Sequence, residues 1–304
     1  KMIVLYVVDL FAFSGILDED AVALAKNKDI VVVGTKKNVF GKDFNEKKIE
    51  ECINHGLEEY GIKPLRIFTV GKDQKSIDQV IDTFKEKIID GEYKGRDVFM
   101  VGRKGSGKTT LISAFLKKYS NQSNENISLE WLNKNLKATI IPLPDGNKFY
   151  ELPDLSNNNS IVSKIEKPIQ NLVTPKTSIT SHSGMLKGGE SVFVGSIAGF
   201  EVTEGEPTNY KYYCAPGVET KKVMASKFND AFKNNMITKL VRPVSSNFIS
   251  MLDFEVFEFC FEKDDIFHEI AIEGLGFFIF KGVGQTIRIC VPKGVYVGDS
   301  LGRI

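Results

Sequence analysis

A glycine-rich segment at residues 102–109 constrains the fold of this chain more than any other feature. It reads Gly-Arg-Lys-Gly-Ser-Gly-Lys-Thr, which fits the Gly-x-x-x-x-Gly-Lys-Thr pattern of a phosphate-binding loop. The apolar run at residues 98–101 predicts a strand before it, and residues 108–119 predict a helix after it. A phosphate-binding loop requires this order of strand, loop and helix. A plain glycine-rich turn with a surface lysine is the alternative, which the full match and its context disfavour.

Each residue type in this loop has a physical task. Glycines let the backbone wrap closely around the α- and β-phosphates, and the helix N-terminus adds partial positive charge. Lys108 is expected to place its charge between the β- and γ-phosphates, and the Thr109 hydroxyl to ligate Mg²⁺. The predicted phosphate-binding residues are Gly102, Arg103, Lys104, Gly105, Ser106, Gly107, Lys108, Thr109 and Thr110.

The phosphate-binding loop comes late in the chain. Apolar runs before it predict strands at residues 3–8, 30–33, 65–70 and 97–101, and these alternate with amphipathic segments at residues 18–26, 46–60 and 75–89. Such alternation predicts an α/β fold with a parallel sheet covered by helices. Because phosphate-binding loops ordinarily follow the first strand of their domain, the order indicates a circular permutation.

The pattern changes after residue 154. A polar run and two prolines, Pro168 and Pro175, indicate an extended connection, so we expect residues 1–167 and 168–304 to form two domains. A chain of 304 residues is long enough for both. The second half is expected to be mostly β, with strands at residues 191–194, 198–202, 210–214, 252–261, 268–273, 277–281 and 286–291. Residues 219–233 predict its single helix.

Two features are expected between the phosphate-binding loop and this boundary. Residues 120–124 are all polar, which predicts a mobile loop. Strands are expected at residues 137–142 and 148–152, joined by a turn at Asp145 and Gly146.

Composition excludes several classes of protein. The formal net charge is +1, so the chain as a whole has no field that attracts nucleic acid or an anionic membrane, and such binding needs a local patch. No apolar run approaches the roughly 20 residues of a membrane helix, so no membrane partner is expected. The 4 cysteines are widely spaced, which predicts reduced thiols in the cytoplasm rather than a metal site.

Three further segments resemble nucleotide-binding motifs in permuted order. After an apolar strand, residues 35–38 read Thr-Lys-Lys-Asn, which resembles the guanine-recognition motif Asn-Lys-x-Asp. Residues 68–72 stand where GTPases carry a small-residue loop that touches the base, and residues 151–154 stand where they carry Asp-x-x-Gly. The predicted base-binding residues are Thr35, Lys36, Asn38, Thr69 and Val70, and Glu151 is a second candidate for Mg²⁺.

Base motifs before phosphate motifs resemble the circularly permuted GTPases, and most of all the YqeH-type family of bacterial ribosome-assembly factors. Residues 7–15, 192–200, 215–216, 274–277 and 291–295 also resemble segments of that family, so the resemblance spans nearly the whole chain. Members usually carry a four-cysteine zinc module upstream of the first strand. No such cysteines occur here, so we expect no zinc in this chain.

The resemblance implies GTP or GDP with Mg²⁺ as ligands, and ribosomal RNA or the small ribosomal subunit as a partner. The C-terminal part of these proteins is thought to be a recognition unit, which directs attention to cations on the expected helix. The candidate RNA contacts are Lys221, Lys222 and Lys227. A solvated helix face is the alternative interpretation.

Several positions depart from the family pattern. Asn38 replaces the Asp that accepts two hydrogen bonds from guanine, and Thr35 replaces the Asn that braces this loop, so we expect modest guanine selectivity. Asp154 replaces the Gly of Asp-x-x-Gly, Leu155 stands where many GTPases carry a water-orienting Gln, and Gly105 stands where potassium-dependent relatives carry Asn. We therefore expect slow or absent GTP hydrolysis, and no catalytic residue is assigned.

Taken with the resemblance, these features predict a guanine-nucleotide-binding protein of small-subunit assembly whose nucleotide state controls association with ribosomal RNA. A degenerate GTPase-like scaffold that binds RNA or protein independently of nucleotide is the alternative. A P-loop ATPase or kinase is a third interpretation, which the permuted order and the C-terminal resemblance disfavour.

Overall fold

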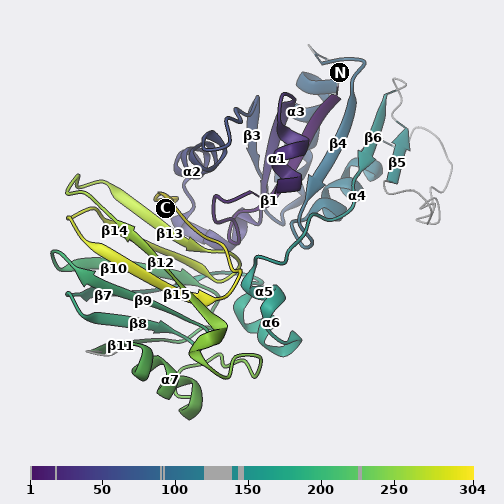
Figure 1. The fold of residues 1–304 in the computed structure, drawn as a ribbon. Coiled ribbons are helices and arrows are strands. Elements are labelled where there is room, and N and C mark those ends of the chain that lie inside the picture. Colours follow the sequence, from purple (N-terminus) through teal and green to yellow (C-terminus); the bar gives the residue numbers. More distant parts are fainter. Residues whose placement is uncertain are drawn as a thin grey trace. The chain divides into compact units, whose positions relative to one another are not determined.

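The fold is described from a computed structural model of the 304-residue chain. The structure describes every residue except 1, 18, 90, 92, 120–138, 143–146 and 225–227. It divides into two compact units (Figure 1). The first unit contains Lys1–Leu10, Leu17–Asn38 and Leu57–Ser156, and the second contains Phe11–Ile16, Val39–Gly56 and Asn157–Ile304. The later part of the chain thus divides at 156/157, and residues 11–16 and 39–56 belong to the second unit. The expected domain boundary at 167/168 remains a prediction.

The first unit is built on one six-stranded sheet with the order β3-β2-β1-β4-β6-β5. All neighbouring strands are parallel except β5, which runs antiparallel to β6. The strands are β1 (Met2–Asp9), β2 (Asp29–Thr35), β3 (Arg66–Thr69), β4 (Asp97–Gly102), β5 (Thr139–Pro142) and β6 (Lys148–Glu151). The alternation of strands and helices expected from the sequence is confirmed, and so is the α/β class.

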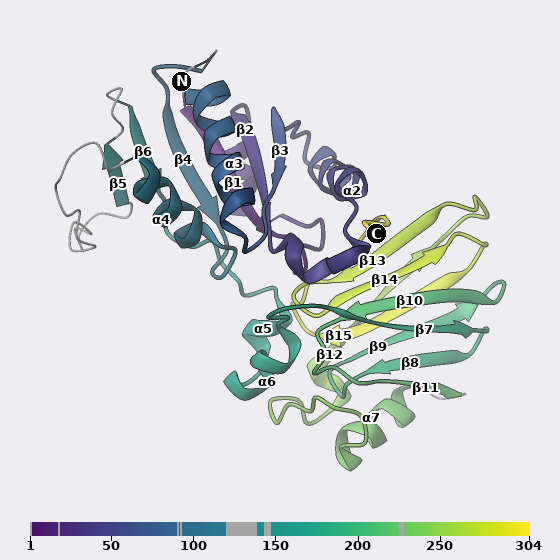
Figure 2. The ribbon, with the colours of Figure 1, turned by 180° about the vertical axis from the view of Figure 1, so that it is seen from behind.

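Helices cover this sheet on both faces. They are α1 (Glu19–Ala25), α3 (Gln74–Phe84) with the π-helical turn η2 (Lys85–Ile89), and α4 (Lys108–Tyr119). Figure 2 shows α3 and α4 on the near face, and Figure 1 shows α1 on the other. Ile77 and Ile81 of α3 and Ile112 of α4 are buried in one cluster with the central strands. Such amphipathic faces explain why these segments form helices here.

The register of the sheet brings three chain segments to one edge. Asp9 at the end of β1 pairs with Thr35 at the end of β2, and Val7 of β1 pairs with Gly102 at the end of β4. Because the strands are parallel, their carboxyl ends meet, and the segments that follow them gather at this edge. The glycine-rich loop and the segment 35–38 are therefore neighbours in space, although more than sixty positions separate them in sequence.

The second unit contains two five-stranded antiparallel sheets, ordered β16-β13-β14-β10-β7 and β11-β8-β9-β15-β12. Their inner faces share one buried cluster, in which the rings of Phe200 on β9 and Phe278 on β14 stack with centroids 3.9 Å apart. The strands are β7 (Thr180–Leu186), β8 (Glu190–Val194), β9 (Ala198–Glu204), β10 (Thr208–Cys214), β11 (Thr220–Met224), β12 (Phe254–Cys260), β13 (Phe267–Ile272), β14 (Gly276–Lys281), β15 (Thr286–Pro292) and β16 (Val297–Leu301). The mostly β character expected for this half is confirmed.

Short helices complete the second unit. Most of α2 (Glu46–Glu58) belongs to it, together with α5 (Ile161–Lys164), α6 (Lys167–Val173) and α7 (Phe228–Thr238). The 3₁₀ segments are η1 (Lys37–Asp43), which begins in the first unit, and η5 (Met251–Asp253).

The helix expected at residues 219–233 is wrong in its first part. Residues Thr220–Met224 form β11, which pairs antiparallel with β8 at the edge of a sheet, and the helix begins only at Phe228. Lysines on one side of an edge strand face solvent and discourage pairing with other chains, so a lysine-rich segment is compatible with this position. Strands β7 and β16 were not expected either, and the turn expected at Asp145 and Gly146 lies outside the described residues.

Candidate functional site

The glycine-rich loop connects β4 to α4, as the sequence predicts. Gly105 and Gly107 adopt φ values of 81° and 99°, a backbone conformation that side chains other than glycine rarely tolerate. A Cβ atom at Gly107 would lie 3.2 Å from Cγ2 of Thr35, so this glycine also lets the segment after β2 approach closely. The Ser106 amide donates to the Arg103 carbonyl at 3.1 Å, which closes the loop on itself.

A cavity of about 540 Å³ lies at this edge of the sheet and brings the two groups of predicted residues together. It is lined by Thr35, Lys36, Asn38 and Val70 from the predicted base-binding group, and by Lys104, Gly105, Gly107, Lys108, Thr109 and Thr110 from the predicted phosphate-binding group. Thr69 and the remaining loop residues do not line it. Gly71, Lys72, Ile77, Leu111 and Asp154 complete the lining. Of these, Ile77 and Leu111 carried no functional signal in the sequence, because they read as core positions of helices.

The Lys108 side chain lies at the bottom of the loop and is only 4% exposed. Its Nζ donates to the carbonyl oxygens of Gly102 at 2.7 Å and Arg103 at 3.3 Å, and it forms an ion pair with the Asp154 carboxylate. A buried ammonium group is stable only when acceptors surround it. The carboxylate of Asp154, which is half exposed, therefore supplies the counter-charge in this structure.

Thr35 joins the two loops directly. Its buried hydroxyl lies 2.6 Å from the Ser106 carbonyl oxygen and 3.1 Å from that of Val8. The shorter contact makes Ser106 the better acceptor for the single hydroxyl proton. The sequence indicated that a bracing Asn is replaced here. The structure shows that the threonine hydroxyl provides a brace of its own between the segment after β2 and the glycine-rich loop.

Lys36 forms an ion pair with Asp9, the last residue of β1. The backbone of Lys36 has φ of 65°, which turns the chain away from β2, and the Lys37 amide then donates to the Val70 carbonyl at 3.0 Å. These contacts hold the segments after β2 and β3 next to each other. The parallel register of β1 and β2, which pairs Asp9 with Thr35, brings Asp9 next to Lys36.

Two buried polar atoms in this region have no hydrogen-bond partner among the described residues. They are Oδ1 of Asn38, at the position of the base-reading carboxylate, and Oγ of Ser106, in the glycine-rich loop. Buried polar atoms without partners are rare in folded proteins, because each costs free energy. Of the two residues, Asn38 lines the cavity and Ser106 does not, so only the Asn38 side chain is a candidate for contact with a bound ligand.

The oxygen donors that Mg²⁺ would need are present. The Thr109 hydroxyl is exposed in the first turn of α4, Glu151 is the last residue of β6, and Asp154 follows that strand. Thr109 and Asp154 line the cavity, whereas Glu151 does not. Burial raises the pKa of Glu151, the Lys108 ammonium lowers it, and the Asp154 carboxylate raises it. Mg²⁺ prefers oxygen ligands of these types, so the residues fit the ion. In the described part of the chain, no group of three or more His, Cys, Asp or Glu side chains has an arrangement that could hold a metal ion by itself.

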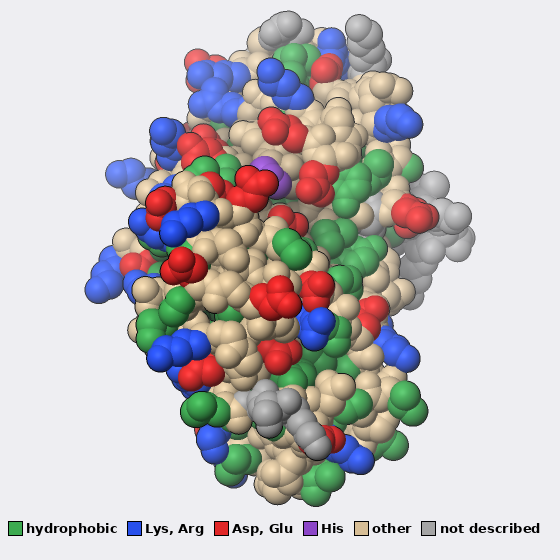
Figure 3. Space-filling model, turned by 60° about the vertical axis from the view of Figure 1, so that its left-hand side comes forward, with side chains coloured by type: hydrophobic (Ala, Val, Ile, Leu, Met, Phe, Trp, Pro, Cys, Tyr) green, Lys and Arg blue, Asp and Glu red, His purple; other side chains and the backbone are tan. Residues whose placement is uncertain are grey.

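Of the candidate RNA contacts, Lys221 and Lys222 lie on the edge strand β11 instead of a helix. The Lys222 Nζ is 2.7 Å from the Glu190 carboxylate and 2.7 Å from the Met185 carbonyl, whereas the Lys221 side chain is exposed. Lys227 lies outside the described residues. On the face drawn in Figure 3, Lys and Arg side chains are interspersed with Asp and Glu, in keeping with the formal net charge of +1.

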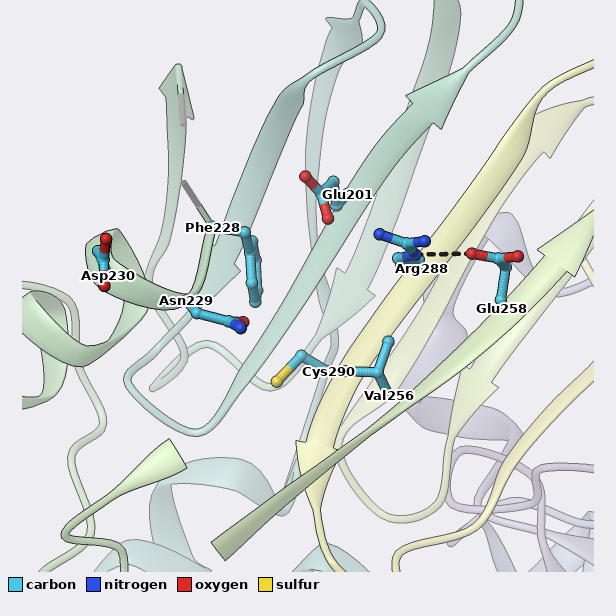
Figure 4. Close-up of a pocket in the computed structure, with 8 residues that line it drawn as sticks. All are labelled: Glu201, Phe228, Asn229, Asp230, Val256, Glu258, Arg288 and Cys290. Carbon is cyan, nitrogen blue, oxygen red and sulfur yellow. Dashed lines mark hydrogen bonds and ion pairs between the residues drawn. The ribbon is translucent and has the colours of Figure 1, made fainter. Parts of the chain in front are cut away.

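A second cavity, of about 820 Å³, lies against the outer face of β9, β15 and β12 beside α7 (Figure 4). The Arg288 guanidinium forms an ion pair with Glu258 at 2.6 Å. Burial raises the pKa of Glu201, and the nearby Arg288 charge opposes that shift. No sequence pattern pointed to this cavity, because its lining residues lie on three strands and on the first turn of α7, at positions that look like ordinary surface positions. Separately, the helices in the described part of the chain are all too short or too polar to cross a membrane.

Comparison with known proteins agrees with the resemblance read from the sequence. No family model matches the chain. A protein of Bacillus subtilis (strain 168), called uncharacterized protein YqeH, is 25% identical over 297 residues, which cover 97% of this chain and 79% of the relative. The match includes both units, so it does not depend on the phosphate-binding loop alone. The chain is therefore similar to this YqeH protein over nearly its whole length, which supports the YqeH-type resemblance.

Proposed function

We propose that this chain binds a guanine nucleotide with Mg²⁺ and acts in the cytoplasm in assembly of the small ribosomal subunit. One observation carries the proposal: the predicted phosphate-binding and base-binding residues, far apart in sequence, line a single cavity. The cytoplasmic assignment rests on the cysteines, which are all unpaired.

The chain's own residues account for nucleotide binding. The glycine-rich loop presents backbone amides at the N-terminus of α4, where anions are favoured, and Lys108 supplies a full positive charge. Thr35 holds the base-side segment against this loop, so phosphate and base contacts are held at a fixed spacing. Mg²⁺, held by Thr109 with Glu151, would neutralise charge on the phosphates.

Hydrolysis by this site is expected to be slow. Leu155 is buried, and its amide donates to the Gly102 carbonyl at 3.1 Å, so an apolar side chain lies beside the loop where many GTPases carry a water-orienting Gln. Gly105 has no side-chain oxygen with which to hold potassium. Loss of one electrostatic stabiliser can reduce turnover by about a hundredfold, so binding rather than turnover is the proposed role of this site.

In this proposal, the nucleotide that is bound controls the affinity of the protein for ribosomal RNA. Binding of purified small subunits is measured with no nucleotide, with GDP and with a non-hydrolysable GTP analogue. We expect the affinity to differ between these states. Equal affinities would instead favour a scaffold that binds independently of nucleotide, an alternative suggested by the Lys108–Asp154 ion pair, which already satisfies the lysine without a ligand.

The lysines of β11 are the proposed RNA contact. Lys221→Glu removes an exposed cation, so we expect weaker association and a shallower dependence on salt, with nucleotide affinity unchanged. Lys293→Glu, on an exposed lysine elsewhere in the second unit, is a matched control. If the two variants bind RNA equally well, the contact lies elsewhere.

A further inference from the structure

The Lys108 ammonium has a full set of acceptors within the chain. Its three N–H groups are matched by three acceptors, the carbonyls of Gly102 and Arg103 and the carboxylate of Asp154. Of these, only the carboxylate carries charge and lies in the lining of the cavity. The side of Lys108 that faces the cavity is therefore occupied by an anion that belongs to the protein.

Backbone hydrogen bonds bring this carboxylate close to Lys108. The Leu152 amide donates to the Met100 carbonyl at 3.0 Å, and the Leu155 amide donates to the Gly102 carbonyl at 3.1 Å. These two bonds fix the segment on both sides of Asp154 against β4 and the start of the loop. These main-chain contacts hold the backbone of Asp154 within reach of the ammonium, and its side chain completes the ion pair.

A polyphosphate uses the same side of the lysine. In a phosphate-binding loop the backbone amides cradle the α- and β-phosphates, and the lysine reaches the β- and γ-phosphates. Carboxylate and phosphate oxygens compete for one ammonium group because both are anionic acceptors. A ligand whose phosphates extend past the β position would bring its charge to the Asp154 carboxylate, and like charges at such a distance repel.

We propose that Asp154 is an internal counter-ion of Lys108 that a bound nucleotide must displace, and that it thereby selects against the triphosphate relative to the diphosphate. This inference rests on the proposed nucleotide site, and not on the proposed ribosomal role. Because Asp154 replaces the Gly of Asp-x-x-Gly, the site favours the nucleoside diphosphate, which ends at the β-phosphate.

The test compares wild type with Asp154→Asn, which keeps the shape of the side chain and removes its charge. Affinities for GDP and for a non-hydrolysable GTP analogue are measured by calorimetry in EDTA, so that metal ligation does not contribute. Inorganic pyrophosphate and tripolyphosphate are measured in parallel, because they report on the phosphate site without any base. We expect the variant to bind the triphosphates about tenfold more tightly and the diphosphates no more than about threefold more tightly.

Three further variants serve as controls. Asp154→Glu keeps the charge and is expected to bind like wild type. Asp154→Ser is a second neutral variant in case Asp154→Asn does not fold. Asp82→Asn removes a carboxylate that pairs with Lys118 at 2.5 Å, away from the cavity lining, and is expected to leave every affinity unchanged.

Thermal unfolding provides a second measurement. Without ligand, Asp154→Asn is expected to unfold at a lower temperature than wild type, because Lys108 loses its counter-charge. With the triphosphate, its unfolding temperature is expected to rise more than that of wild type, because tighter binding stabilises the folded state more.

The outcomes separate this inference from the proposed function. If Asp154→Asn binds triphosphate no more tightly than wild type, while Lys108→Ala abolishes binding to both, the nucleotide site is correct and the counter-ion role is wrong. If neither wild type nor Asp154→Asn binds any polyphosphate, or if Lys108→Ala binds as wild type does, both the nucleotide site and the counter-ion role are wrong.

Discussion

Asn38 is the residue on which we expect the choice of base to depend. It lines the cavity, and its Oδ1 is buried without a hydrogen-bond partner among the described residues. Guanine offers two adjacent donors on its recognition edge, and an amide provides an acceptor for only one of them. An amide therefore discriminates weakly between guanine and adenine at this position.

Replacing Asn38 with Asp restores the second acceptor and adds charge, so we predict that Asn38→Asp raises the ratio of GTP to ATP affinity by about tenfold or more. Competition binding with both nucleotides measures the ratio. A wild-type protein that already prefers GTP by about a hundredfold would show that another residue reads the base.

Thr35 is the second residue with a testable role. Thr35→Val keeps the methyl group that packs on Gly107 but removes the hydroxyl that donates to Ser106, leaving a buried carbonyl without that partner. We predict a loss of about 1–2 kcal/mol in unfolding free energy and weaker nucleotide binding. Thr35→Ser keeps the hydroxyl and should bind nucleotide nearly as wild type does, as measured by denaturant unfolding and calorimetry. Equal binding by the valine variant would remove Thr35 from the site.

At the scale of elements, the loop after α7 is tied to α6 by one carboxylate. Burial raises the pKa of Glu166, but hydrogen bonds from Ser245 and Ser246 outweigh it and lower the pKa to about 2. The hydroxyl of Ser245 donates at 2.6 Å and the amide of Ser246 at 2.7 Å. Because the folded-state pKa lies below the unfolded value of 4.5, Glu166 stabilises the second unit above pH 4.5, and this contribution disappears as the pH falls toward 2.

The pH dependence can be measured with a single variant. Glu166→Gln is predicted to be less stable than wild type at pH 7 by about 1 kcal/mol, a small value because solvent screens this partly exposed carboxylate. The difference should shrink as the pH falls from 4.5 toward 2. A difference that stays constant with pH would show that the charge of Glu166 does not contribute.

Elements with strong apolar patterns were predicted well, and the others were not. Strands β1, β2 and β4 are buried apolar runs between polar segments, and the sequence identifies them directly. Strand β7 reads Thr-Ser-His-Ser-Gly-Met-Leu and becomes a strand only because β10 pairs with it. Strand β11 was mistaken for a helix because its lysines and its single valine also fit a helical spacing.

In the whole molecule, the sequence predicts many of the residues that line the cavity but not how the chain divides. Residues 11–16 and 39–56 belong to the second unit, where the buried guanidinium of Arg303 forms an ion pair with Glu269 and donates to the Phe13 carbonyl at 2.7 Å. The contact with Phe13 joins residues 290 positions apart, and no local pattern encodes it. The ion pair of Asp154 with Lys108 could not be predicted from the sequence either, because it depends on the register of β6 beside β4.

The central claim, that the glycine-rich loop is a nucleotide site, is tested most directly by one calorimetric comparison. Wild type and Lys108→Ala are titrated with GDP in the presence of Mg²⁺. We predict measurable binding by wild type and at least a tenfold loss in the variant, because Lys108 is the one full positive charge buried within the loop as the structure describes it. Equal affinity of the two proteins for GDP would contradict the claim.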